Sequence, residues 1–259
     1  MSVLREFCGF GGYTRQPAGY MSWQHLVFVS SLMAVMIFCA VFFGLKNKHK
    51  DENAKNKALV IAAISIDLFE LLKIVLLSFR GNDPLHFLYD LPLFLCSIQL
   101  ITIPLAAFSK GRVKAASLDF VTIFGILGAV MGTYFAGQNY ACYPVLSFDN
   151  VVSGITHSIS GFASLYIMIS GMASMNKKNV PITLTILGSF CVGAYVANIF
   201  TNANYMFLLR GDGTPYDIFY NLVNGNAVLY PLIVVALFVL YIMLFYFTYY
   251  RIAHKKEKK

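Results

Sequence analysis

The chain has 259 residues, of which 58% are hydrophobic and only 12% are charged. Soluble domains carry about 25% charged residues, so little of this surface is built to face water. The net charge of +8 does not indicate a nucleic-acid partner, because the basic residues stand in short segments between long apolar runs. We therefore expect one all-α membrane domain over residues 1–259, with no soluble domain attached.

Seven apolar stretches approach the roughly 20 residues that a helix needs to cross a bilayer. The third is the shortest, and Pro104 near its end predicts a kink, whereas Pro92 falls in the first turn, where proline is tolerated. The residues before the first stretch are polar and Gly-rich, so this stretch is expected to be an uncleaved anchor and not a signal peptide. The expected seven-transmembrane-helix bundle covers about 24–45, 58–79, 91–108, 118–136, 151–173, 181–202 and 227–249.

The lysines and arginines between the spans predict the orientation. Fifteen lie in the loops after the first, third and fifth spans and in the C-terminal tail, whereas four lie on the other side. Because basic loops remain in the cytoplasm, we expect a multi-pass protein of the cell membrane with its C-terminus in the cytoplasm and its N-terminus outside. Cys8 and Cys142 then both lie outside, where they either form a disulfide or remain free.

Three ionisable residues lie within the second span, namely Asp67, Glu70 and Lys73. Helical periodicity places them within an arc of about 120°, so they share one face. Glu70 and Lys73 are three residues apart and can form an ion pair. Ionisable groups inside a bilayer cost roughly 2.5–3.5 kcal/mol each on insertion scales and mark candidate functional sites. The face is either a buried polar contact between helices or part of such a site.

Cys96 in the third span and His157 in the fifth are the candidates for chemistry. Both spans enter from the outside, and both residues are expected about 8–9 Å below the outer edge. A thiol and an imidazole at one depth can form a nucleophile and base pair. The alternatives are a cysteine that packs as a small hydrophobe and a histidine that bonds to another helix. Lys73 and Asn198 lie in the same half, so the polar groups indicate a cavity open to the outer leaflet.

Two features of the fourth span concern its packing. Gly128 and Gly132 form a GxxxG step, which predicts close approach of another helix of the bundle. Asp119 lies at the expected cytoplasmic edge of this span, and we expect it to be a solvated cap.

The segment LPLFLCS from Leu91 to Ser97 resembles the LPLHLCS motif of the YwaF-like bacterial membrane proteins. Further matches occur in the family's order over nearly the whole chain: Glu70, Thr156-His157-Ser158, the segment NANYMFL from Asn202 to Leu208, Pro215 and Tyr230-Pro231. The resemblance implies seven helices. Eukaryotic relatives of the family are phospholipid acyltransferases with a cysteine nucleophile, so it also implies that Cys96 accepts an acyl group and that His157 is its base. The family's histidine before the cysteine is Phe94 in this chain.

Two functions from different classes fit these observations. The first is a lipid acyltransferase or lipid hydrolase of the outer leaflet, with a membrane lipid as substrate. The second is a transporter or binding protein for a small solute or lipid, although no inverted repeat supports transport. The sequence predicts no cofactor, no bound metal and no nucleic-acid partner, and it does not define the oligomeric state. The candidate site residues are Cys96 and His157 for catalysis and Glu70, Lys73, Asn198, Asn202 and Asn204 for substrate binding.

Overall fold

The structure, a computed structural model, describes residues 3–257, and this part of the chain is helical without a β-strand. Five helices are long and apolar enough to cross a membrane: α2 (Trp23–Asn47), α5 (Gly111–Tyr134), α7 (Phe148–Ser170), α8 (Val180–Thr201) and α10 (Leu229–Glu257). The expectation of an all-helical, multi-pass membrane protein is confirmed. Short elements fill the connections: α1 (Val3–Phe7), η1 (His86–Tyr89), α6 (Gly137–Cys142), η2 (Lys177–Asn179), η3 (Tyr205–Phe207) and α9 (Asp217–Leu222).

Two more helices correspond to the second and third expected spans. The helix α3 (Glu52–Gly81) has 30 residues, and α4 (Gln99–Phe108) is apolar but has only ten. The prediction that the third span is helical from residue 91 is wrong, because the chain makes a series of turns before α4 begins at Gln99. Pro92 has no N–H group, and the N–H of Leu91 donates to the hydroxyl of Tyr205 at 3.3 Å. A distant side chain thus takes the place of helical hydrogen bonding here.

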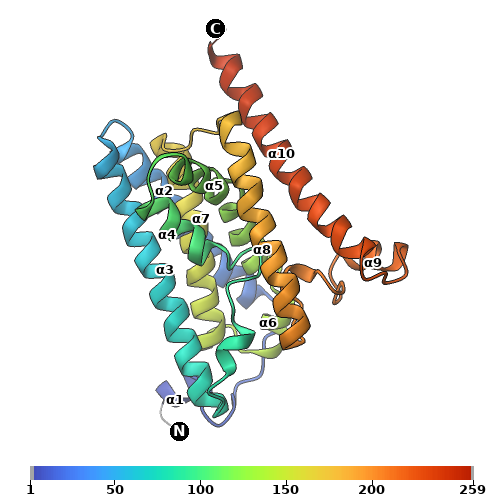
Figure 1. Cartoon of the computed structure of the whole chain (residues 1–259). Coiled ribbons are helices and arrows are strands. Elements are labelled where there is room, and N and C mark those ends of the chain that lie inside the picture. The colour runs from blue at the N-terminus through green and yellow to red at the C-terminus, as the bar shows by residue number, and fades with distance from the viewer. Residues whose placement is uncertain (1–2, 258–259) are drawn as a thin grey trace.

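The helix α7 lies at the centre of the bundle, in contact with α2, α3 and α5, while α4 packs against α3 and α5 (Figure 1). Small residues let α5 and α7 approach closely. Ser160 donates a hydrogen bond to the carbonyl of Gly125 at 3.3 Å, and Ser164 donates to the carbonyl of Thr122 at 2.8 Å. These serines satisfy their hydroxyl groups within the bundle, which apolar surroundings require.

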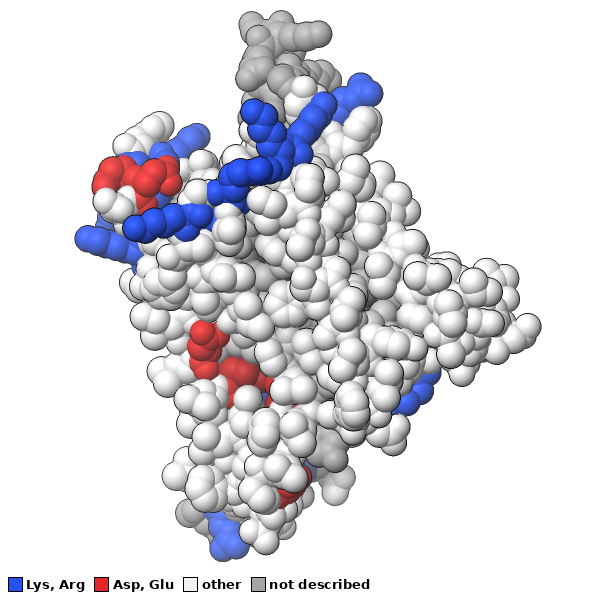
Figure 2. Space-filling view, viewed as in Figure 1, with Lys and Arg blue, Asp and Glu red and all other residues white. Residues whose placement is uncertain are grey.

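The two ends of the bundle differ in charge. The N- and C-termini lie at opposite ends in Figure 1. Figure 2 shows lysines and arginines gathered toward the C-terminal end, above a mostly uncharged belt. Lys258 and Lys259 of the expected basic tail lie outside the described residues.

A cluster of polar side chains lies at the end of the helix bundle opposite the basic side chains. Arg80 at the end of α3 bonds to Asp149 at the start of α7 through both η nitrogens, at 2.7 and 2.8 Å, and Tyr13 donates to the same carboxylate. Burial raises the pKa of the Tyr13 phenol above its ordinary value. Cys8 is buried beside this cluster and Cys142 is exposed, and both are free thiols.

Asp119 is not the solvated cap that its position in the sequence predicts. The residue is 0% exposed and accepts three hydrogen bonds, from the N–H of Met175 (3.0 Å), the amide of Asn179 (2.8 Å) and the hydroxyl of Tyr246 (3.0 Å). Because buried carboxylates require such donors, Asp119 joins α5 to α10 and to the segment before α8.

Candidate functional site

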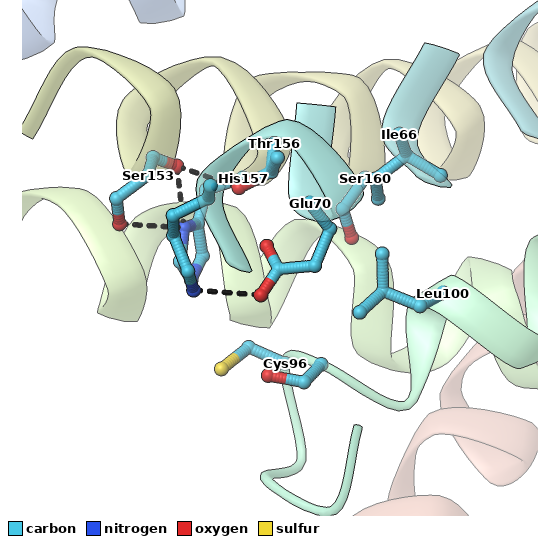
Figure 3. A pocket seen from close by; sticks show the side chains of 10 residues that line it. Ile66, Glu70, Cys96, Leu100, Ser153, Thr156, His157 and Ser160 are labelled. Atoms are coloured by element: carbon cyan, nitrogen blue, oxygen red, sulfur yellow. Dashed lines mark hydrogen bonds and ion pairs between the residues drawn. The ribbon is translucent and has the colours of Figure 1, made fainter. Parts of the chain in front are cut away.

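A polar pocket of about 60 Å³ lies between α3, α7 and the turns that precede α4. It brings together four of the seven predicted site residues, namely Cys96, His157, Glu70 and Lys73, from three segments far apart in the chain (Figure 3). The complete lining is Ile66, Glu70, Lys73, Cys96, Ser97, Leu100, Ser153, Thr156, His157 and Ser160.

The helix α7 fixes the orientation of the His157 ring. Its Nδ1 atom lies 2.7 Å from the carbonyl oxygen of Ser153, one helical turn earlier. Because a carbonyl only accepts, Nδ1 carries the proton of the neutral ring, which leaves Nε2 as the basic nitrogen. The imidazole and the thiol of Cys96 line the same pocket. The ring is therefore held in the tautomer that can take a proton from the thiol.

Cys96 stands just before α4. The N–H groups of Gln99 and Leu100 already bond to the carbonyls of Cys96 and Ser97, at 3.3 and 3.0 Å. The N–H groups of Cys96 and Ser97 themselves bond to no other residue in the described part of the chain. Free N–H groups at a helix N-terminus favour negative charge. The backbone around the thiol can thus stabilise a developing anion.

Lys73 lies between two carboxylates. Its Nζ atom is 2.6 Å from Oε1 of Glu70 and 3.1 Å from Oδ1 of Asp90, and Nε2 of His86 lies 3.3 Å from the other oxygen of Asp90. The pairing of Glu70 with Lys73 expected from their spacing is thus present. Asp67 does not join this group, because its side chain is exposed on the outside of α3. Figure 2 shows acidic atoms at the surface in the middle of the uncharged belt.

The three predicted asparagines lie elsewhere, at the end of α8 and in the loop after it. The amide of Asn198 bonds to both backbone groups of Tyr205, donating to the carbonyl at 3.1 Å and accepting from the N–H at 2.6 Å. Asn204 donates to the carbonyl of Arg210 at 2.7 Å and accepts from Leu209 at 3.0 Å. Asn202 ends α8 in a left-handed conformation, with φ of 55°. Asn198 and Asn204 fix a loop, and none of the three asparagines lines the pocket, because position along a helix predicts the depth of a side chain but not its direction.

The loop held by Asn198 in turn holds the segment that carries Cys96. The hydroxyl of Tyr205 donates to the carbonyl of Leu88 at 2.7 Å and accepts from the N–H of Leu91 at 3.3 Å. Its ring lies 5.0 Å from the ring of Phe94. Phe94, where the resembled family has histidine, therefore packs against Tyr205 and does not line the pocket. Tyr205 and Asp90 are the positioning residues that the sequence analysis missed, because both act through contacts with distant segments.

Replacing Tyr205 by phenylalanine is expected to lower the free energy of unfolding by about 2 kcal/mol, because the N–H of Leu91 and the carbonyl of Leu88 lose their buried partner. Hydrogen–deuterium exchange should rise in residues 88–95, while exchange in α2 stays unchanged. Tyr195→Phe on α8 is the matched control, since the hydroxyl of Tyr195 forms no hydrogen bond with a described residue. Equal effects of the two substitutions would contradict the assigned role of Tyr205.

The fold and the pocket define a polytopic helical membrane protein with a half-buried thiol and imidazole between its helices. The model described as the TMEM164 family matches residues 20–249, and the chain belongs to this family. The match spans α2 to α10 and includes every residue of the pocket. No curated protein and no solved structure matches the chain. The YwaF-like resemblance and the acyltransferase relatives that it implies stay predictions.

Proposed function

We propose that the chain is a lipid acyltransferase or lipid hydrolase in which Cys96 is the nucleophile and His157 its base. The observation that supports this most is the Nδ1 contact of His157 with the Ser153 carbonyl, which leaves a basic nitrogen on a ring that lines the same pocket as the thiol. Cysteines that serve only as small hydrophobes need no such partner.

The reaction begins when His157 Nε2 takes the proton of the Cys96 thiol. The sulfur attacks the carbonyl carbon of a lipid ester, and the carbonyl oxygen gains negative charge that the N–H groups of Cys96 and Ser97 can stabilise. The ester C–O bond then breaks, His157 returns the proton to the departing oxygen, and the acyl group remains on Cys96 as a thioester. The hydroxyl of a second lipid completes an acyl transfer, and water completes a hydrolysis; both restore the thiol.

The volume of the pocket limits which part of a lipid can enter it. Pockets that enclose a whole drug-sized ligand measure roughly 300–1,000 Å³. At about 60 Å³, this cavity admits the reacting ester group, while the acyl chains remain in the surrounding bilayer. A lipid that reaches the site from the side of the membrane fits this size better than a soluble ester.

The predicted substrate-binding residues receive different roles. Lys73 is engaged by two carboxylates, and the amides of Asn198 and Asn204 are engaged by the backbone. We therefore assign Lys73 and these asparagines to positioning, and only Glu70 keeps a place beside the substrate. The transport alternative requires Asp67, Glu70 and Lys73 to line one path, but Asp67 is exposed on the outside of α3 and does not line the pocket with the other two.

The proposal includes the topology expected from the sequence. Seven crossings require α3 to span the membrane and the turns before α4 to complete the crossing that its ten residues leave short. The gathering of basic side chains at the C-terminal end supports a cytoplasmic C-terminus at the cell membrane. His157 lies nearer the beginning of α7, at the opposite end, so the pocket belongs to the outer half.

Incubation of the purified protein with lipids that carry a labelled acyl ester tests the proposal. Mass spectrometry of peptides is expected to find the acyl group on Cys96 of the wild-type protein and none after Cys96→Ala. His157→Ala should lower the rate of adduct formation by roughly 100-fold or more, which is the usual contribution of a general base.

Cys39→Ala is the control, because Cys39 is a half-buried cysteine on α2 outside the pocket. It should form the adduct at the wild-type rate. Two results would overturn the proposal. One is an acyl group that is still attached to another residue after Cys96→Ala. The other is a wild-type protein that forms no adduct with either glycerophospholipid or lysophospholipid esters.

A further inference from the structure

The GxxxG step of α5 lies directly behind the two reactive side chains. A Cβ atom added at Gly132 would overlap with the ring of His157, at its Cδ2 and Nε2 atoms. A Cβ added at Gly128 would lie 3.3 Å from the Cβ of Cys96 and 3.4 Å from its Cα. The helix therefore approaches both members of the pair, with one glycine behind each.

The two positions differ in how much space they leave. Contacts of 3.3 Å are tight but need only a shift of a few tenths of an ångström, so alanine at Gly128 displaces Cys96 slightly. The overlap at Gly132 cannot be relieved by such a shift. The ring must leave its place, and its Nδ1 contact with the Ser153 carbonyl resists this movement.

Gly125, two turns earlier on the same helix, has another role. A Cβ there would meet the carbonyl of Ser160 at 2.7 Å, which belongs to the contact between α5 and α7. Helix packing thus accounts for Gly125, but not for Gly132, whose neighbour is the His157 side chain.

We propose that Gly132 is a positioning residue, which leaves the space in which the His157 ring stands against Cys96, and that Gly128 sets how far Cys96 approaches that ring. This inference rests on the proposed pairing of Cys96 with His157, and it adds the residues that set the geometry of the pair. It does not require that the pair carries out acyl transfer.

The test measures the rate at which iodoacetamide alkylates Cys96, by peptide mass spectrometry, as a function of pH in detergent. The wild-type profile should contain an inflection from the imidazole, and His157→Ala should lose it. Gly132→Ala is expected to lose the same inflection and reproduce the His157→Ala profile. Gly128→Ala should keep the wild-type shape with a rate within a few-fold.

Gly188→Ala is the matched control, because it is a helical glycine of α8 whose added Cβ would meet nothing within 4 Å. It should leave the profile unchanged. A folded Gly132→Ala protein with the wild-type profile overturns the proposal.

A second measurement covers the case in which Gly132→Ala unfolds. The double variant Gly132→Ala, His157→Ala has room for the new methyl group where the ring stood, so its unfolding temperature should return to that of His157→Ala alone. If the double variant stays as unstable as Gly132→Ala, the proposal is wrong. If the double variant regains the stability of His157→Ala but the wild-type protein forms no acyl adduct, this inference about Gly132 holds and the proposed function is wrong.

Discussion

Replacing Asp119 by alanine is expected to lower the free energy of unfolding by about 3 kcal/mol or more, because three buried donors lose their acceptor at once. The donors come from Met175, Asn179 and Tyr246, which belong to different segments. Their loss should separate α10 from the bundle before the remaining helices unfold. Unfolding in detergent, monitored by protease cleavage after α8, measures both the stability and the order.

A graded series separates this role from a general effect of mutation at a buried site. Tyr246→Phe removes one donor and leaves Asp119 with two, so it should cost only about 1 kcal/mol. Asp83→Ala removes a single exposed bond to the N–H of Leu85 and should cost about as little. If Asp119→Ala is no more harmful than Asp83→Ala, the carboxylate does not join these segments.

Lys73→Met is expected to destabilise the protein by about 3 kcal/mol, whereas Glu70→Gln should cost about 1 kcal/mol. The two expected losses of stability differ because Lys73 lies between two carboxylates. Removal of its ammonium group leaves Glu70 and Asp90 near each other without the lysine between them. Removal of the Glu70 charge leaves Lys73 paired with Asp90. Chemical unfolding of each variant in the same detergent at neutral pH makes the comparison.

The double variant Glu70→Gln, Lys73→Met should be more stable than Lys73→Met alone, since it leaves one carboxylate, which has His86 beside it. Glu52→Gln provides the control, because Glu52 forms an i, i+3 pair with Lys55 but is 72% exposed. Exposed pairs contribute about 0–1 kcal/mol. A double variant less stable than both single variants would show that Lys73 and Glu70 contribute independently.

Local periodicity in the sequence was sufficient to predict the long helices and one ion pair. The apolar stretches that became α2, α5, α7, α8 and α10 are long enough that hydropathy alone identifies them. The pairing of Glu70 with Lys73 is predicted by their separation on a helix. Equal depth made Cys96 and His157 candidates for a pair, and the pocket contains both.

The features that the sequence analysis missed depend on contacts between distant segments. The turns from Leu91 to Ile98 look like the beginning of an apolar helix in the sequence, and the hydroxyl of Tyr205, which bonds to Leu88 and Leu91, comes from a distant segment. Asn198 lies at a depth similar to that of the pocket, but its amide is satisfied by a loop that no local pattern predicts. Asp119 stands near an expected helix end, and its burial depends on α10, more than a hundred residues later.

The dependence of Leu88 and Leu91 on Tyr205 also constrains how the protein is made. These partners are separated by 117 and 114 positions in the chain. When the ribosome has just completed α4, the side chain that shapes the Cys96 segment has not yet been synthesised, and α7, with His157, is also missing. A chain interrupted before α7 would therefore contain Cys96 but lack both His157 and Tyr205. The arrangement of the Cys96 segment is therefore completed only after the second half of the protein has been synthesised and has packed against the first half.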